Sequence, residues 1–198
     1  LLKQGKKAEA EARFRALIAT GGDGFDVRQR LGDLYLDQGQ PEKGIAELER
    51  AKKLDPDRAE PYERLAALYE KRGDTQAALR ELQGAARLDI MDAELQGKLV
   101  EKLHAARMFA PAVEAGVQAR YLSPYAWELR ETIGASLLEL NKKAEARVEL
   151  EAALKAFPAS EEGDGAADGK DPELEARHRK LQALYERAGG VLPQKSGG

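Results

Sequence analysis

A 34-residue period runs through most of this chain and constrains its fold more than any other feature. Bulky apolar residues return at one position of the period, and small residues return at another. The bulky residues are Leu31, Leu65, Leu99 and Ile133, and the small residues are Ala10, Gly44, Ala78, Ala112 and Ala146. A fixed period of this length is typical of repeat arrays, in which each repeat buries its apolar faces against its neighbours. The sequence therefore predicts a stacked array built to hold other molecules rather than a catalytic domain.

Each period contains the local signals of two helices joined by a turn. In residues 59–92, Pro61 lies where the first turn of a helix tolerates a missing N–H group, and apolar residues up to Tyr69 follow at helical spacing. Gly73 then interrupts this helix, and Asp74 is placed to cap the next one. The same reasoning predicts turns at residues 38–40, 72–74, 106–108 and 140–142.

The order of bulky, small and aromatic positions, closed by Pro56, Pro124 and Pro158, resembles the tetratricopeptide repeat over nearly the whole chain. The resemblance implies an all-α fold, a right-handed superhelix (solenoid) of antiparallel helix pairs. In such pairs the small residues let two helices approach closely, and the bulky residues fill the space between neighbours. We expect full repeats at 25–58, 59–92, 93–126 and 127–158, preceded at 1–24 by the second helix of a truncated repeat.

The two ends of the chain depart from the period. The chain begins inside a repeat and without Met, so we expect it to be part of a longer protein. Residues 159–171 are rich in Gly, Asp, Glu and Ala and are predicted to form a flexible insertion, because they contain too little apolar surface to bury. Residues 172–189 repeat the first-helix pattern and are expected to form a capping helix, followed by a tail at 190–198.

One core position breaks the pattern of large side chains. The fourth copy of this position is Gly116, whereas the other copies are Phe14, Leu48, Leu82 and Leu150. We expect Gly116 either to allow an unusually close approach of two helices or to leave a gap filled by Met108, Phe109 or Tyr121.

The residue types needed for catalysis or metal binding are scarce. The chain has no cysteine and two histidines, His104 and His178, which lie in different repeats. Glu101 and His104 are one helical turn apart, but a lone pair of this kind is typical of a solvated surface. We therefore predict no enzyme activity, metal site or cofactor within these residues. The absence of cysteine suits either the cytoplasm or a bacterial periplasm, and the Ala-, Arg- and Glu-rich composition is typical of a bacterial protein.

The resemblance places the candidate function in a concave groove lined by the first helix of each repeat. Of the twenty positions expected to face this groove, eleven are acidic and one is basic, although the whole chain has 35 acidic and 32 basic residues. Tyr125 and Trp127 are candidate aromatic contacts, with packing between successive repeats as the alternative. The predicted groove residues are Asp33, Leu36, Asp37, Glu63, Glu70, Glu101, His104, Glu131, Leu138 and Glu139.

These positions predict a non-catalytic scaffold that binds a basic or extended protein segment in an acidic concave groove. Acids in the first turn of a helix also complement the helix dipole without any ligand, so a merely solvated groove is the alternative. Nucleic acid is disfavoured because phosphate binding needs a basic stripe. Binding of an acidic carboxyl tail is disfavoured in the same way. The basic residues between Arg177 and Arg187 are expected to solvate the capping helix.

Two other functions fit the same pattern. The repeats could be the appendage of a larger enzyme, for example a bacterial hydrolase, whose catalytic domain lies upstream of residue 1. Self-association is a third possibility, because repeat arrays also serve as contacts between copies. No apolar run approaches the roughly 18 residues that a membrane span requires, so membrane insertion is not expected.

Overall fold

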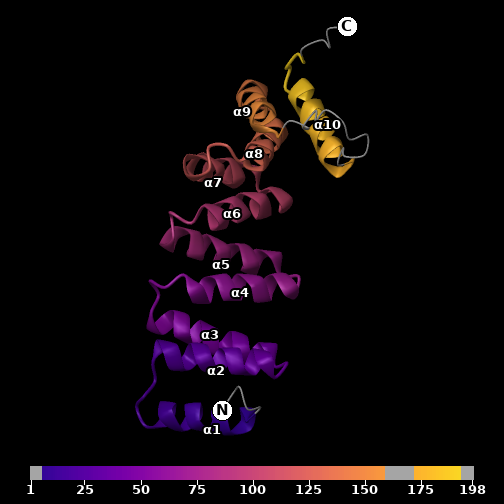
Figure 1. Cartoon of the computed structure of the whole chain (residues 1–198). Helices are drawn as coiled ribbons and strands as arrows, with labels where there is room; N and C mark the ends of the chain where they lie inside the picture. Colours follow the sequence, from indigo (N-terminus) through magenta and orange to yellow (C-terminus); the bar gives the residue numbers. More distant parts are fainter. Residues whose placement is uncertain (1–5, 159–171, 193–198) are drawn as a thin grey trace. The chain divides into compact units, whose positions relative to one another are not determined.

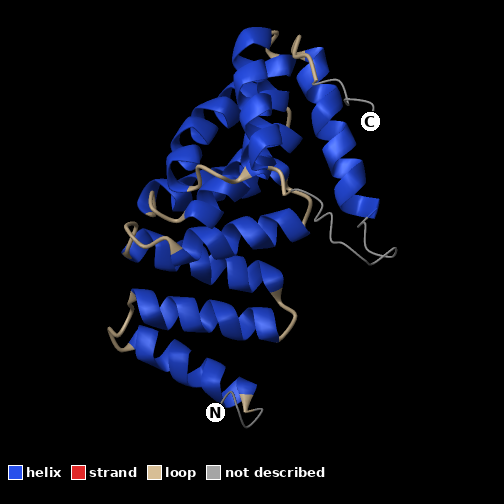
Figure 2. Ribbon diagram, turned by 45° about the horizontal axis from the view of Figure 1, so that its top comes forward, coloured by secondary structure: helices blue, strands red, loops and turns tan. Residues whose placement is uncertain are grey.

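The computed structural model describes residues 6–158 and 172–192, and this part of the chain is helical with no strand (Figure 2). The prediction of an all-α helical-repeat fold is confirmed. The insertion and tail predicted at 159–171 and 193–198 lie outside the described residues, as do residues 1–5. The helices are α1 (Lys7–Ala19), α2 (Phe25–Asp37), α3 (Pro41–Leu54), α4 (Glu60–Lys71), α5 (Thr75–Leu88), α6 (Ala93–Ala105), α7 (Phe109–Leu122), α8 (Trp127–Glu139), α9 (Lys143–Ala156) and α10 (Pro172–Arg187).

Three-residue turns join α2 to α3, α4 to α5, α6 to α7 and α8 to α9, and each turn falls where the sequence predicts it. Turns this short place the joined helices side by side as antiparallel pairs. The middle residue of each turn has a positive φ angle, which ends the first helix in the left-handed conformation. These residues are Gly39 (φ 70°), Gly73 (φ 77°), Arg107 (φ 60°) and Asn141 (φ 58°).

Side chains at the helix starts complete these turns. Pro41 is the first residue of α3, where it blocks no hydrogen bond within the helix. The carboxylate of Asp74 accepts a hydrogen bond from the backbone N–H of Ala77 at 3.0 Å, as predicted. Asp92 caps α6 in the same way, through the backbone N–H of Leu95 at 3.0 Å.

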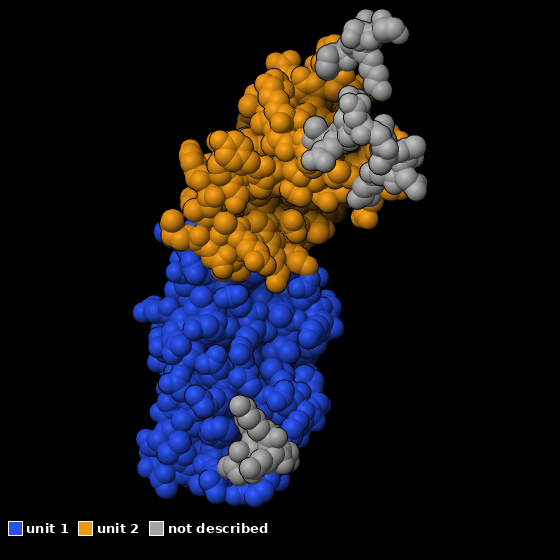
Figure 3. All heavy atoms as spheres, in the orientation of Figure 1, with its two compact units in different colours: residues 1–90 blue, residues 91–198 orange. Residues whose placement is uncertain are grey.

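The chain forms two compact units, residues 1–90 (unit 1) and 91–198 (unit 2), shown in different colours in Figure 3. In unit 1, helices α1 to α5 pack in chain order (Figure 1). Leu31 and Leu34 pack with Ala10, while Leu48 and Leu65 form a second cluster with Ile45. These side chains come from the recurrent bulky and small positions, so the period encodes the core of the unit.

Unit 2 combines α6 to α9 with the final helix α10, which packs against both α9 and α8. Leu181 on α10 has no exposed surface and joins the core cluster that contains Ile133, Leu137 and Leu150. The remaining face of α10 carries mainly polar residues.

Gly116 provides close helix packing rather than a gap. A Cβ atom at Gly116 would lie 2.5 Å from Cγ1 of Ile133, so the side chain of Ile133 on α8 occupies this space. The prediction that Met108, Phe109 or Tyr121 fills the position is wrong. Met108 and Tyr121 are 40% and 76% exposed, because the glycine brings α8 itself within reach of α7.

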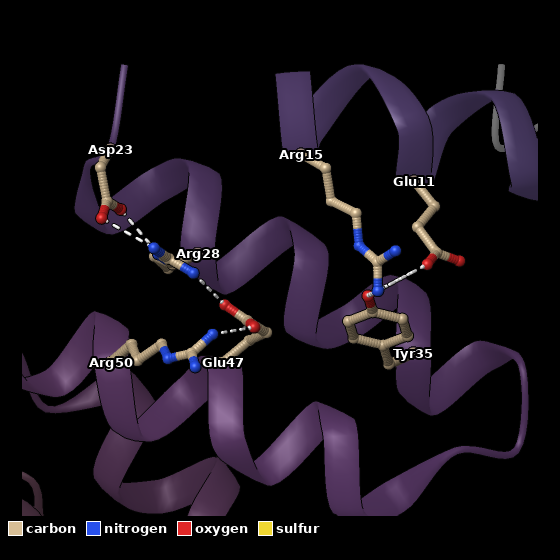
Figure 4. A network of polar contacts seen from close by, with 7 residues as sticks. All are labelled: Glu11, Arg15, Asp23, Arg28, Tyr35, Glu47 and Arg50. Atoms are coloured by element: carbon tan, nitrogen blue, oxygen red, sulfur yellow. Dashed lines mark hydrogen bonds and ion pairs between the residues drawn. The ribbon is translucent and has the colours of Figure 1, made fainter. Parts of the chain in front are cut away.

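A buried glutamate recurs at the same repeat position in each unit, 102 residues apart. In unit 1, Glu47 on α3 is 7% exposed and binds Arg28 of α2 at 2.7 Å and Arg50 at 2.6 Å (Figure 4). Arg28 also binds Asp23 at 2.6 Å, and these hydrogen bonds hold the pKa of Arg28 above its ordinary value. In unit 2, Glu149 on α9 binds Arg130 at 2.7 Å and also Arg120.

Candidate partner-binding faces

Unit 1 presents four predicted groove acids on its first helices: Asp33 and Asp37 on α2, and Glu63 and Glu70 on α4. We call these four residues the unit 1 face. Asp37, Glu63 and Glu70 are exposed, and the side chain of Asp33 is 37% exposed. Asp33 forms an ion pair with Arg64, which ties α4 to α2 along this face.

Two cations contact the ends of the helices that carry the unit 1 face. Arg58 lies 3.6 Å from Asp26 and 3.2 Å from Glu60, which are acids in the first turns of α2 and α4. Lys7 donates a hydrogen bond to the backbone carbonyl of Asp37 at 2.6 Å, at the end of α2. Asp37 and Glu70 lie near the C-terminal ends of α2 and α4, where an acid does not complement the helix dipole, whereas Glu63 lies in the first turn of α4.

Two apolar residues predicted to line the groove pack in part against the cores of their units. Leu36 is half-buried and packs against the unit 1 core, with its Cδ2 atom 2.5 Å from where a Cβ of Gly44 would lie. Leu138 is also half-buried and packs against the unit 2 core. Each leucine therefore gives part of its surface to the core, and contact of the rest with a partner side chain stays a prediction.

In unit 2, the basic residues of α10 bind the predicted groove acids of α8. Glu131 is 8% exposed, and Lys180 lies 2.8 Å from its carboxylate. Arg187 lies 3.7 Å from Glu139. The prediction that these cations merely solvate the capping helix is wrong, since α10 neutralises the acids that the sequence assigns to the groove.

A cavity of about 390 Å³ lies between α6, the following turn, α8 and α10. We call it the unit 2 pocket. Its charged lining contains three cations and one acid. The lining residues are His104, Ala105, Arg107, Phe109, Ala135, Glu139, Lys180, Leu184 and Arg187.

His104 forms a flat wall of the unit 2 pocket. Its Nδ1 atom lies 2.8 Å from Oγ of Ser136, which itself donates to the carbonyl of Thr132. The Nδ1 atom must then be the donor, because the hydroxyl proton is already used. The ring of Phe109 packs against the imidazole at 5.5 Å. Burial lowers the pKa of His104 from 6.5, and Lys180 adds to this effect, so the ring is uncharged at neutral pH.

The other candidate residues are divided between surface and core. Glu101 is exposed on α6, and Tyr125 is 85% exposed. Trp127 is 8% exposed, with Phe157 at 4.5 Å and the guanidinium of Arg177 at 4.3 Å from its ring. Trp127 therefore packs inside unit 2, which is the alternative that the sequence allowed, and it offers no exposed ring to a partner.

Within 6–158 and 172–192, no three His, Cys, Asp or Glu side chains are placed to hold a metal ion. None of the helices in these ranges is long and apolar enough to cross a membrane.

Comparison with known proteins agrees with this architecture. A family model described as tetratricopeptide repeat matches residues 1–69. This match identifies tetratricopeptide repeats in the first third of the chain. Two solved structures share the fold. MamA is 22% identical, with a TM-score of 0.58 over 84% of this chain and 91% of that one. YrrB, a tetratricopeptide repeat protein with an unusual peptide-binding site, is 16% identical, with a TM-score of 0.61 over 91% of this chain and 87% of that one. No curated protein matches the sequence.

Tetratricopeptide repeats are protein-interaction scaffolds, so the candidate sites are surfaces for a protein or peptide. Sequence reasoning missed two features of those surfaces. The first feature is the recurrent pair Arg28–Glu47 and Arg130–Glu149, whose members are 19 positions apart in each case, a repeated spacing visible in the sequence. Arg107 occupies the turn position that carries glycine in two other repeats, and this departure from the period was the available signal.

Proposed function

We propose that the unit 1 face binds a basic, extended peptide segment, and that the protein acts as a non-catalytic scaffold through this contact. The observation that carries the proposal is the set of exposed acids on two successive first helices, Asp37, Glu63 and Glu70. The description of YrrB as a protein with a peptide-binding site supports a peptide as the ligand class.

The mechanism is electrostatic capture followed by contact along the two helices. Charges within about 8 Å act together at physiological salt, so acids on α2 and α4 attract a cationic segment as a group. Such attraction acts mainly on the association rate, and screening by salt weakens it. An extended segment suits this face because its Lys and Arg side chains can reach both helices.

The acids of unit 2 contribute less to this activity. Glu131 is buried under Lys180, and Glu139 pairs with Arg187. The buried carboxylate of Glu131 offers a peptide little surface, whereas Asp37, Glu63 and Glu70 are exposed. We therefore place the basic-peptide site on α2 and α4 and leave Glu131 and Glu139 out of it.

The test uses a fluorescein-labelled peptide of alternating Lys and Ser, with association followed by stopped-flow polarisation. The double variant Glu63→Lys and Glu70→Lys should lower the association rate about tenfold at low salt. The control variant Asp57→Lys and Glu114→Lys makes the same change in net charge at exposed positions outside the face, and it should alter the rate much less. Equal effects of the two variants would show that only net charge matters and would contradict the proposal.

A further inference from the structure

Arg107 lies at a turn position of the repeat where a long side chain strains the backbone. The equivalent turn residues are Gly39, Gly73, Asn141 and, after α10, Gly189, all with positive φ. Glycine adopts this conformation freely and asparagine tolerates it, whereas a residue such as arginine is strained by roughly 1–2 kcal/mol. A strained residue that persists where glycine would serve points to a role for its side chain.

That side chain lines the unit 2 pocket. The guanidinium of Arg107 lies over the ring of Phe109, 5.6 Å from its centre. The other two cations of the lining have acidic partners, Lys180 with Glu131 and Arg187 with Glu139. Among the described residues, no carboxylate forms an ion pair with Arg107, so this guanidinium provides the pocket with an uncompensated positive charge.

We propose that the unit 2 pocket binds an internal Glu or Asp side chain of an acidic peptide, together with a bulky apolar neighbour. Arg107 supplies the planar pair of N–H donors that matches a carboxylate, and Lys180 and Arg187 add positive charge at the same cavity. The rings of His104 and Phe109 and the side chain of Leu184 form the apolar wall against which the neighbouring residue packs. A volume of about 390 Å³ is within the range of specific small-ligand sites.

This inference is separate from the proposed function, because it concerns other helices and a ligand of opposite charge. The sequence disfavours an acidic ligand because most of the groove positions on the first helices, α2, α4, α6 and α8, are acidic. The pocket reverses this expectation in unit 2 because its cations come from a turn residue and from α10.

The test uses the peptide acetyl-Gly-Glu-Phe-Glu-Gly-amide, whose blocked ends leave the two Glu side chains as its charges, and a matched peptide with Gln in place of Glu. Affinity is measured by isothermal titration with the whole chain. The Glu peptide should bind at least about tenfold more tightly than the Gln peptide. Arg107→Gly should remove this preference. Arg107→Lys should reduce it, because lysine keeps the positive charge but lacks the planar pair of N–H donors.

Asn141→Gly is the matched control, because Asn141 holds the same turn position after α8 and does not line the pocket. Arg107→Gly should raise the melting temperature by relieving strain, Asn141→Gly should change it less because asparagine tolerates this conformation, and only Arg107→Gly should weaken binding of the Glu peptide. Arg107→Gly with unchanged preference for Glu over Gln would overturn the proposal. Equal affinity of wild-type protein for the two peptides would overturn it as well.

Discussion

The first helices of unit 1 and unit 2 carry acids at equivalent repeat positions, but the two units use them differently. In unit 1, Asp33 pairs with Arg64, while Glu63 and Glu70 remain exposed on α4. In unit 2, Glu131 is buried under Lys180, and Glu139 lies beside Arg187. The helix packed beside the acids decides whether they face solvent, as α10 does for Glu131 and Glu139. The charge of a face therefore cannot be obtained by counting the residues of one helix.

Core substitutions should have the largest effects and should be similar in both units. Leu65 in unit 1 and Leu150 in unit 2 have no exposed surface. Leu65→Ala and Leu150→Ala should each lower the free energy of unfolding by about 2–5 kcal/mol, because each leaves a cavity between packed helices. Urea denaturation followed by circular dichroism measures this loss. A change below about 0.5 kcal/mol in one unit would show that its core had been assigned to the wrong face.

The glycines of unit 2 should respond in opposite directions. Gly116→Ala should lower the free energy of unfolding by about 1–3 kcal/mol, because its Cβ would collide with Ile133. Gly97→Ala on α6 should raise it by roughly 0.5–1 kcal/mol, since no atom lies within 4 Å of the new Cβ and alanine favours the helix. Thermal and urea melts of both variants check the contrast. Destabilisation by Gly97→Ala would contradict the packing described for α6.

Removing one cation from each unit tests the electrostatic comparison directly. Lys180→Met leaves Glu131, whose side chain is 10% exposed, without the ammonium group at 2.8 Å, and should lower the free energy of unfolding by about 1–3 kcal/mol. Arg64→Met leaves the more exposed Asp33 in contact with water, so the loss should stay below about 1 kcal/mol. A larger loss for Arg64→Met than for Lys180→Met would reverse the comparison.

His104 should make a small contribution to pH dependence in unit 2. Its pKa is lowered in the folded state by burial and by Lys180, against the opposite effects of Glu139 and Glu131. The unfolded chain therefore takes up a proton first as the pH falls below 6.5, and stability decreases from there until the folded state is protonated as well. His104→Gln should flatten this part of the stability profile, measured by urea melts at several pH values. An unchanged slope in the variant would assign the effect to other groups.

The fold was predictable from the sequence because the period fixes both cores and turns. The turns at 38–40, 72–74, 106–108 and 140–142 follow from one repeat position that the chain must cross in the left-handed conformation. Gly116 was harder to interpret, because the identity of the residue that fills its space depends on how closely α8 approaches α7. A periodic pattern records which positions are small, and it does not record the distance between helices.

The candidate sites were predictable only in part. The acids of α2 and α4 could be named from the period, because the helices packed around them also follow the 34-residue period. Lys180 and Arg187 could not be placed beside Glu131 and Glu139, because residues 159–171 interrupt the period before α10. The inward position of Leu36 depends on Gly44 of the paired helix, which a count of groove positions ignores.

The central claim is that the two units prefer ligands of opposite charge, and one exchange of variants tests it. Binding of the Lys–Ser peptide and of the Glu–Phe–Glu peptide is measured with wild-type protein, with the variant Glu63→Lys and Glu70→Lys, and with Arg107→Gly. The first variant should weaken binding of only the basic peptide, and Arg107→Gly should weaken binding of only the acidic one. Loss of both peptides in either variant, or loss of neither in both, would contradict the account.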